Sequence, residues 1–453
     1  MGSRRCAYPA GTTRNCANTV RRLAGSRVRL LAVHTILCTT GLLSTSGCGT
    51  DGVLPPTPPV VRDSAGVRIV ENIEPQWLTG SEWKLSARPI VSIEANDDEL
   101  ETGPVDPVTA FILRTGEVVI LDGNQNGWDR GLLFDSAGTF VRHLGRSGNG
   151  PCEFRQVFGG GRYREDSIAV HDFAARSITI ISAGGECVRT ISIPITQPVT
   201  RNPQWSHTFP GVYNDGGFLV SPYGVADVKD GDDTAWYIHR VITLRADGSA
   251  TETPGGDMAL SRTGISPGKR SPQSVPRLHG ERRFVVPYDS GLVVGENTRF
   301  DLHVLDASGS VRLIARRSHE PVRLTDADQR NAVTHLRSMT VSTERSYAQS
   351  RTVEQEVAGM SWPEFKPAWS NLRVDELGNL WLEEYRFYDP LEVPDNPPPT
   401  YWSVFDRNGV WLGQVQVPGR LLVHDIYDDR LIGVWKDDVG AASVRVYRIN
   451  KPQ

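Results

Sequence analysis

Acidic residues are absent from the first 47 positions, which hold seven arginines instead. The other 406 residues contain 42 basic and 53 acidic residues, a formal charge of −11. Binding to a phosphate backbone or to an anionic membrane surface requires a basic patch. We therefore expect no nucleic-acid partner, and no contact of the folded part with a membrane through its own surface.

Signatures of several enzyme classes are also missing. The sequence has no Gly-x-Ser-x-Gly elbow of the serine hydrolases, and no phosphate-binding lysine follows the glycine run at 159–161. The histidines are scattered, without the spacing of a helical zinc site, and the cysteines lack zinc-type spacing too. Catalytic residues therefore remain unassigned, and an enzymatic role is the less favoured interpretation.

The start of the chain has the features of an export signal. Four arginines at 21–29 precede an uncharged, mostly apolar run over 30–43, which is too short to span a bilayer comfortably. Small residues then lead to Cys48, as at a bacterial lipoprotein cleavage site where the cysteine becomes the lipidated N-terminus. A plain secretory signal or an N-terminal anchor is the alternative. We predict a lipoprotein signal peptide over 1–47.

A tether follows the predicted lipid. Residues 49–59 are rich in Pro, Gly and Thr, a composition typical of a semi-extended linker. The prediction is thus a lipidated cysteine and tether over 48–60 and a folded domain over 61–453. The protein would be exported and anchored by lipid in the bacterial cell envelope, on the periplasmic side or at the outer membrane.

An internal repeat organises the folded domain. A turn rich in Gly and Asp precedes an alternating apolar strand six times, with the turns at 114–116, 165–166, 214–217, 289–291, 375–379 and 428–430. A second hairpin follows the first five copies, at 134–138, 181–185, 244–248, 305–309 and 405–409. Each repeat therefore predicts a four-stranded antiparallel unit.

The sixth unit lacks its second hairpin because the chain ends. A matching Asp-Ser-Ala-Gly copy at 61–70 could supply the missing outer strand, and strands from both termini would then close a ring. The prediction is an all-β, six-bladed β-propeller with four-stranded blades. A two-sheet sandwich or two smaller β domains are the alternatives.

An insertion near 322–360 interrupts the repeats. Thr325 and Asp328 fit a helix cap, and 329–339 and 344–357 are compatible with helices. Five tryptophans gather in the last two blades, where we expect them to pack mostly between blades: Trp369, Trp381, Trp402, Trp411 and Trp435.

Three segments resemble a known family. The Leu144 to Phe154 segment is similar to the Gly-Arg-x-Gly-x-Gly-Pro-Gly-Glu-Phe stretch of bacterial six-bladed propeller lipoproteins, which are relatives of the NHL-repeat propellers. The Asp63 to Asn72 start and the Asp375 to Trp381 unit resemble the same family. The resemblance spans about 61–449 and implies the propeller fold, but it names no activity. Cys152 stands where the family has glycine, and a disulfide with Cys187 is left open.

Propellers bind ligands on one face, around the central channel, where the second strand of each blade ends. Ten polar residues occupy those ends: Asp122, His171, Asp172, Tyr223, Glu296, Asn297, Glu384, Tyr385, Lys436 and Asp437. Carboxylate and amide oxygens in such a ring could hold Ca²⁺. Polar residues at loop ends are also ordinary in a soluble propeller, so no metal site is assigned.

Two functions from different classes remain. The favoured one is a lipid-anchored binding or scaffold module whose channel face takes an envelope protein, a peptide or a small ligand. The alternative is a metal-dependent hydrolase, lactonase or lyase, an activity found among propellers of similar fold. Converging carboxylates in the channel would favour the alternative, and an apolar plug would favour the binding module.

Overall fold

The computed structural model describes residues 55–94, 107–124, 128–194, 206–225, 234–266, 273–275, 278–343, 357, 360–387, 397–437 and 441–452. The chain divides into two units, Met1–Gly52 and Val53–Gln453, and all described residues belong to the second. The predicted signal peptide and Cys48 thus lie outside the described residues. In the part of the chain that is described, no helix is long and apolar enough to cross a membrane.

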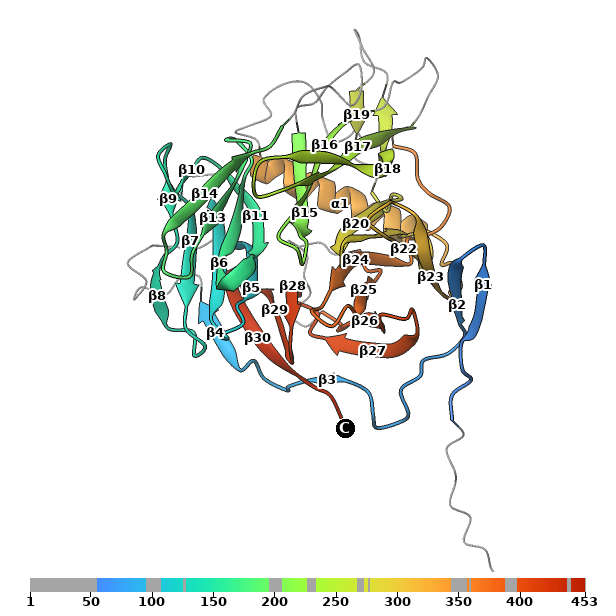
Figure 1. Cartoon of the computed structure of the whole chain (residues 1–453). Helices are drawn as coiled ribbons and strands as arrows, with labels where there is room; N and C mark the ends of the chain where they lie inside the picture. Colours follow the sequence, from blue (N-terminus) through green and yellow to red (C-terminus); the bar gives the residue numbers. More distant parts are fainter. Residues whose placement is uncertain are drawn as a thin grey trace, which may run out of the picture. The chain divides into compact units, whose positions relative to one another are not determined.

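Six antiparallel sheets follow one another around a ring in chain order (Figure 1). Blade 1 contains β5 (Pro107–Ile112), β6 (Val118–Asn124), β7 (Trp128–Phe134) and β8 (Phe140–His143). Blade 2 contains β11 (Val157–Arg162), β12 (Ile168–Asp172), β13 (Ser177–Ile181) and β14 (Cys187–Ser192). Blade 3 contains β15 (Ser206–Val212), β16 (Phe218–Val225), β17 (Thr234–Leu244) and β18 (Ala250–Ser266), extended by β19 (Gln273–Val275). A short parallel pair, β9 (Arg146–Ser147) and β10 (Glu153–Phe154), lies between blades 1 and 2, and the 3-10 turn η1 (Arg164–Asp166) joins β11 to β12.

The other three blades repeat this order. Blade 4 contains β20 (Arg283–Tyr288), β21 (Gly291–Glu296), β22 (Asp301–Leu305) and β23 (Val311–Arg317). Blade 5 contains β24 (Trp369–Val374), β25 (Leu380–Glu384), β26 (Thr400–Phe405) and β27 (Trp411–Val417). Blade 6 contains β28 (Leu421–Tyr427), β29 (Arg430–Lys436) and β30 (Ala442–Asn450). The structure therefore confirms the six-bladed propeller predicted from the repeats and implied by the family resemblance.

The strand that closes the ring is not the predicted one. The outer edge of β30 pairs with β4 (Val91–Glu94) and with the short β3 (Lys84–Leu85), so the N-terminal part of the chain does complete blade 6. The copy at 61–70, however, pairs elsewhere. The distance along the chain explains the correction, because the outer strand of blade 6 must lead directly into β5 of blade 1. β4 ends 13 positions before Pro107, whereas the 61–70 copy is much further away.

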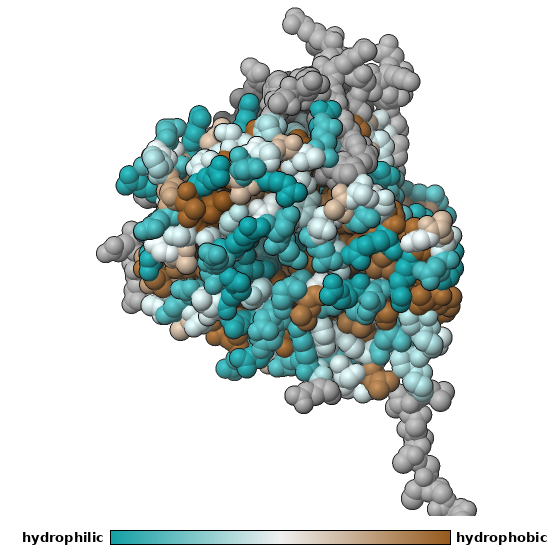
Figure 2. Space-filling model, viewed as in Figure 1, coloured by the Kyte–Doolittle hydropathy of each residue, from teal (hydrophilic) through white to brown (hydrophobic). Residues whose placement is uncertain are grey.

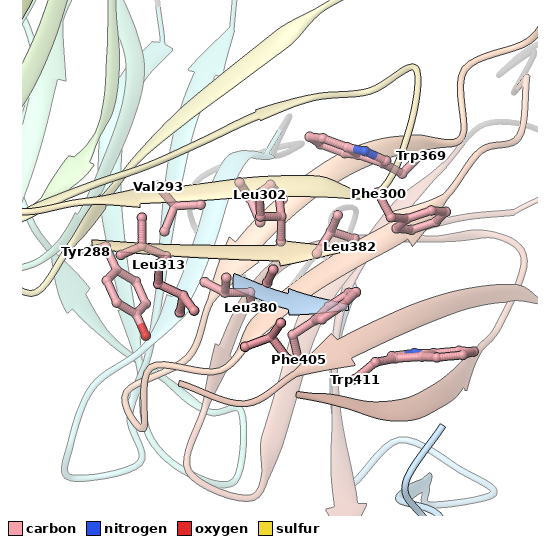
Figure 3. Close-up of a cluster of buried hydrophobic side chains, with 14 of the residues drawn as sticks. Tyr288, Val293, Phe300, Leu302, Leu313, Trp369, Leu380, Leu382, Phe405 and Trp411 are labelled. Carbon is pink, nitrogen blue, oxygen red and sulfur yellow. The ribbon is translucent and has the colours of Figure 1, made fainter. Parts of the chain in front are cut away.

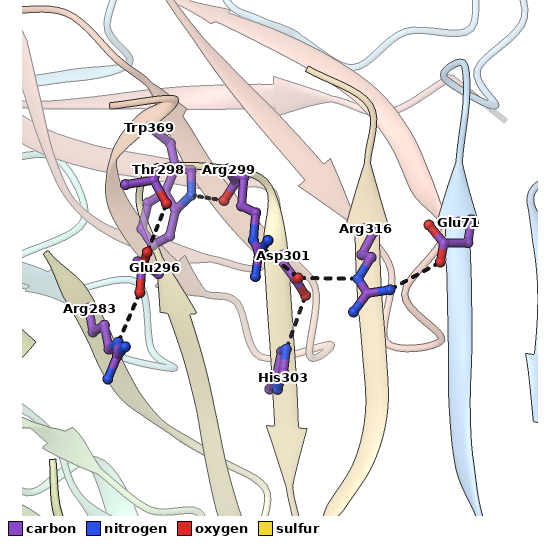
Figure 4. Close-up of polar contacts among 9 residues, drawn as sticks. All are labelled: Glu71, Arg283, Glu296, Thr298, Arg299, Asp301, His303, Arg316 and Trp369. Atoms are coloured by element: carbon purple, nitrogen blue, oxygen red, sulfur yellow. Dashed lines mark hydrogen bonds and ion pairs between the residues drawn. The ribbon is translucent and has the colours of Figure 1, made fainter. Parts of the chain in front are cut away.

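The 61–70 copy instead forms a hairpin on blade 4. β1 (Val60–Ser64) pairs with β2 (Val67–Asn72), and β2 runs parallel to β23, which gives that sheet six strands. One ion pair links the added hairpin to the blade: Arg316 lies 3.2 Å from Glu71 on β2, and 3.2 Å from Asp301 within blade 4 (Figure 4). Exposed pairs of this kind stabilise a protein by about 1 kcal/mol or less. The apolar contacts of Val70 are therefore the stronger link.

The segment 72–94, which we call the N-terminal strap, runs from blade 4 past blade 5 to blade 6. Trp77 N–H donates to the Leu412 carbonyl at 2.8 Å, and the indole ring of Trp77 lies against Gly413. A Cβ atom at Gly413 would come within 2.2 Å of that ring, so only glycine allows the approach. Further on, Ile90 N–H donates to the Val446 carbonyl at 2.7 Å. The strap therefore ties three consecutive blades together.

Asn72 is the most constrained residue of the strap. Its side chain is 3% exposed and donates to the Arg316 and Gly409 carbonyls at 2.8 and 2.9 Å. Its carbonyl oxygen accepts the Trp411 N–H at 2.8 Å. One amide thus joins β2 to blades 4 and 5.

Asn72→Ala should lower the free energy of unfolding by roughly 2–3 kcal/mol, because it leaves buried backbone groups without partners. Denaturant unfolding followed by circular dichroism measures the change. Asn408→Ala, which removes an exposed amide from a nearby turn, is the matched control and should change stability by about 0.5 kcal/mol or less. Equal losses in the two variants would contradict this role.

The core lies between the blades. A cluster of buried side chains joins blades 4 and 5 and includes Val293, Leu302, Trp369 and Trp411 (Figure 3). A second cluster, with Trp381 and Trp402, joins blades 5 and 6. The prediction that the tryptophans pack between blades is confirmed for these four. Trp435 is only half-buried, and the guanidinium of Arg445 lies 4.1 Å from the centre of its ring.

The insertion after blade 4 begins with α1 (Asp326–Thr343). Thr325 and Asp328 cap it reciprocally: the Thr325 N–H donates to the Asp328 carboxylate at 2.9 Å, and the Asp328 N–H donates to Thr325 Oγ1 at 3.2 Å. The first predicted helix and its cap are thus confirmed. Most of the second, over 344–357, lies outside the described residues.

A disulfide links Cys152 to Cys187, with their Cα atoms 5.5 Å apart. Cys152 has a φ of 56°, a left-handed conformation that glycine adopts more readily than other residues. The turn is held by Glu153, whose carboxylate accepts the N–H groups of Asn149 and Gly150 at 3.0 and 2.8 Å. A left-handed cysteine is strained by about 1–2 kcal/mol, and the hydrogen bonds and the crosslink offset that strain.

Candidate functional site

The two faces of the ring differ in their connections. Tight turns join the first strand of each blade to the second, as at Gly116 and Gly378, where positive φ angles of 92° and 80° favour glycine. The second strands end on the other face, where longer connections such as 384–400 and the α1 insertion lie. Hydrophilic side chains cover much of the face in view in Figure 2, with hydrophobic residues in separate patches.

An ion pair joins the innermost strands of two blades that are not neighbours. Arg162, on β11 of blade 2, reaches Asp425 on β28 of blade 6, with one nitrogen 3.1 Å from the carboxylate. The same guanidinium donates to the Ile112 carbonyl of blade 1 at 2.8 Å and lies 4.2 Å from the centre of the Tyr427 ring. The innermost strands of blades 1, 2 and 6 are therefore held together by one arginine.

A second arginine does the same between blades 5 and 6. Arg373 on β24 donates to the carbonyls of His424 and Val423 at 3.0 and 3.4 Å, and to Asn371 at 2.7 Å. Among the described residues, hydrogen-bonded guanidinium groups thus join the innermost strands of blades 1, 2, 5 and 6, a group that we call the polar centre.

His424 completes this polar centre. Its Nδ1 atom accepts the Ala110 N–H at 3.0 Å, which requires the neutral ring. Burial lowers the pKa of His424 to about 4, and the Arg373 charge acts in the same direction. The histidine is therefore a structural acceptor at neutral pH.

Stability should consequently depend on pH. The unfolded chain takes up the proton near pH 6.5 and the folded chain only near pH 4, so the stabilisation is complete above pH 6.5 and is lost as the pH falls through 4. We expect a loss of roughly 2–3 kcal/mol from this residue between pH 7 and 4. His424→Asn, whose amide oxygen can accept the same N–H, should flatten this part of the curve in urea unfolding at pH 7, 5.5 and 4.5. Identical pH dependence in both proteins would contradict the assignment.

The ten predicted channel-face residues each have contacts of their own in the structure. Asp122 is paired with Arg130 at 2.9 Å, and Asp172 accepts the N–H groups of Arg155, Gln156 and Ala175. His171 is fully buried and stacks on Phe209. Among the described residues, no three His, Cys, Asp or Glu side chains come close enough together to hold a metal ion.

The remaining predicted residues are placed as follows. Tyr223 stacks on His239, whose ring centre is 4.7 Å away. Glu296 is paired with Arg283 at 3.0 Å (Figure 4). Asn297 accepts the Arg282 N–H at 2.8 Å. Glu384 is paired with Arg317 at 2.8 Å. Lys436 contributes a carbonyl to Arg420, and Asp437 accepts the Ala441 N–H at 2.7 Å.

Tyr385 is the predicted residue that lines a hollow. The hollow measures about 170 Å³ and lies between α1, the chain that returns from the insertion, and the end of β25. We call it the α1 pocket, and its lining residues are Asp328, Asn331, Lys366, Tyr385, Arg386 and Phe387.

Hydrogen bonds fix the polar groups of the α1 pocket. The Tyr385 hydroxyl lies 2.6 Å from His279 Nδ1, and Lys366 Nζ lies 2.6 Å from an Asp328 carboxylate oxygen. Burial opposes ionisation of Asp328, but hydrogen bonds from Lys366 and Thr325 outweigh it and hold its pKa at about 2. Burial raises the pKa of Tyr385 far above its usual value, so the phenol stays protonated.

Aromatic rings surround His279 at the base of the α1 pocket. The Phe387 ring centre is 4.5 Å away, and the Trp362 ring centre is 6.3 Å away. The sequence alone does not predict the residues around the α1 pocket. Three of them belong to an insertion outside the repeat: Asn331, Trp362 and Lys366. By contrast, the sequence does contain a signal for His424 and Asp425, because these two polar residues interrupt an otherwise apolar strand.

No protein-family model and no curated protein matches the chain. Among solved structures, a putative exported protein from Bacteroides fragilis is 13% identical, with 84% of this chain and 100% of that chain covered and a TM-score of 0.45. A member of the DUF4221 family from Bacteroides vulgatus is 14% identical over 82% and 99%, with a TM-score of 0.47. Virginiamycin B lyase from Staphylococcus aureus is 10% identical over 82% and 100%, with a TM-score of 0.39. Likenesses this remote assign neither a family nor an activity.

Proposed function

We propose that this protein is an extracytoplasmic binding module that holds a small ligand, or a short segment of an envelope partner, in the α1 pocket. The observation that carries the proposal is the pocket itself. A hollow lined by a carboxylate, an amide, an ammonium, a guanidinium, a phenol and an aromatic ring combines polar groups that orient a ligand with apolar area that binds it. It lies at the end of a second strand, on the face predicted to bind ligands.

The location follows from the N-terminal sequence. An apolar signal, Cys48 and a Pro-rich tether would place the propeller outside the cytoplasm on a lipid anchor. Residues 55–59 have no helix or strand and lead directly into β1, as expected of a tether. Lipidation at Cys48 remains a prediction, which incorporation of a radiolabelled fatty acid into the wild type and not into Cys48→Ala would support.

The alternative of a calcium-dependent hydrolase also remains a prediction. The carboxylates proposed for it, Asp122, Asp172 and Glu384, are each engaged by donors of the protein. Metal analysis of protein purified without chelator distinguishes the two functions. About one Ca²⁺ per chain would favour the enzyme.

A pocket-filling variant tests the binding function. Asn331→Trp should fill the α1 pocket, whereas Asn408→Trp places the same ring on an exposed turn and is the control. Saturation-transfer NMR with separate mixtures of small carboxylates, amides, amines and sugars reports binding. We expect a compound from at least one mixture to bind the wild type and Asn408→Trp. The affinity of that compound for Asn331→Trp should be at least tenfold lower. Binding by none of the mixtures, or binding that Asn331→Trp leaves unchanged, would contradict the proposal.

A further inference from the structure

We infer that the α1 pocket selects a small organic anion with a planar apolar body, such as an aromatic carboxylate. This inference rests on the proposed binding function and specifies the chemistry of its ligand. Three features of the pocket carry it: the balance of charge, the arrangement of the donors and the aromatic base.

The charge balance of the pocket favours an anion. Lys366 and Arg386 line it, and the charge of Arg282 acts on Tyr385. The opposing carboxylate, Asp328, is fully engaged within the protein: one oxygen binds Lys366, and the other accepts both the N–H and the hydroxyl of Thr325. Asp328 therefore orients Lys366, and both of its oxygens already accept hydrogen bonds from the protein.

The second carboxylate near the pocket is also engaged. Glu383 lies 3.4 Å from Arg386 and is 12% exposed, so it faces the protein interior. Burial raises its pKa above the usual value of a glutamate. Among the residues that line the pocket, two cations therefore stand against one carboxylate.

Donors of two kinds converge on the hollow. The ammonium of Lys366 carries three N–H groups, of which Asp328 takes one, and its side chain is 26% exposed. The side chain of Arg386 is 20% exposed and is fixed by the Gly419 carbonyl and by Glu383. Two cations held in place by other residues are suited to the two oxygens of one carboxylate.

The base of the pocket suits a flat body. The rings of Phe387 and Tyr385 line the pocket, and Phe387 lies against the buried His279, so a planar group can pack against rings rather than aliphatic chains. At about 30 Å³ per water molecule the hollow takes roughly six water-sized groups. A single ring with one short charged arm matches that size, with its far edge toward solvent.

Three isosteric probes test the inference: benzoate, benzamide and benzamidinium share one shape and carry charges of −1, 0 and +1. Isothermal titration calorimetry on the whole folded unit measures each affinity. We expect benzoate to bind at least tenfold more tightly than benzamide and benzamidinium to bind more weakly still.

Two pocket variants and one control locate the effect. Lys366→Met should weaken benzoate at least fivefold and bring its affinity close to that of benzamide, and Arg386→Gln should act in the same direction if Lys366→Met fails to fold. Lys84→Met removes an equal charge from an exposed site on β3 and should leave all three affinities unchanged.

The inference is overturned if benzamide or benzamidinium binds as tightly as benzoate, if none of the three probes binds, or if both pocket variants bind benzoate like the wild type. The NMR experiment tests the proposed function independently of these probes. If Asn331→Trp abolishes binding in the NMR mixtures while benzoate does not bind, the binding function stands and the ligand is not an aromatic anion.

Discussion

Trp381→Ala lowers the free energy of unfolding by about 3–5 kcal/mol, the range for removing a fully buried large side chain. The indole is 0% exposed, packs in the cluster between blades 5 and 6, and lies 5.8 Å from the ring of Trp83 on the strap. Its N–H also donates to an Asp375 carboxylate oxygen at 3.0 Å. The substitution therefore removes an inter-blade contact and a buried hydrogen bond together.

Denaturant unfolding of the soluble unit measures this loss. Trp435→Ala is the matched control, because Trp435 is half-buried at the edge of the same cluster and should cost clearly less. Trp381→Phe separates the two contributions, since it keeps most of the packing and loses the donor to Asp375. If Trp381→Ala unfolds at the same denaturant concentration as the wild type, the contact between blades 5 and 6 contributes little to stability.

Removal of the disulfide is the second large effect. The Cys152–Cys187 bond closes a loop across 35 positions, and in the chain-entropy description a loop of that length stabilises the folded state by about 4 kcal/mol. The double variant Cys152→Ser/Cys187→Ser should lose roughly this amount. It also leaves a serine in the strained left-handed position of Cys152 without the crosslink.

The unfolding midpoints of the wild type and of the double variant are compared in denaturant without reductant. Wild-type protein treated with reductant is the internal control, and its midpoint should move to that of the double variant. Two free thiols in the denatured, unreduced unit, or a double variant as stable as the wild type, would contradict the assignment.

The sequence repeats predicted the blades because each repeat contains its own turn and strands. The Asp375 unit shows why the motif is informative. Its carboxylate accepts the Asn379 N–H at 2.8 Å, the Asn379 side-chain amide at 2.7 Å and the Trp381 N–H, so the Asp, Asn and Trp of the pattern are one hydrogen-bonded group. A local pattern of this kind is readable without the fold.

Features that depend on distant segments were harder to predict. The 61–70 copy has the pattern of an outer strand, but any blade with an open edge could accept it, and blade 4 does. The Cys152–Cys187 pair was left open, because the relation between a loop of one blade and the outer strand of the next depends on the twist of the sheets. The α1 pocket depends on an insertion that no repeat describes, so only Tyr385 was named from its place at a strand end.

The pairing of β4 with β30 also sets an order of assembly. Glu94 lies opposite Ser443, and Arg68 lies opposite Leu313, so these contacts join parts of the chain that are made far apart in time. During synthesis the N-terminal strands wait for their partners, and blade 6 is complete only when the last residues emerge. Contacts of such long sequence separation slow folding and leave unpaired strand edges in the incomplete chain. A nascent chain that stops before Ala442 therefore leaves one edge of β29 unpaired, and the ring can close only when β30 has been made.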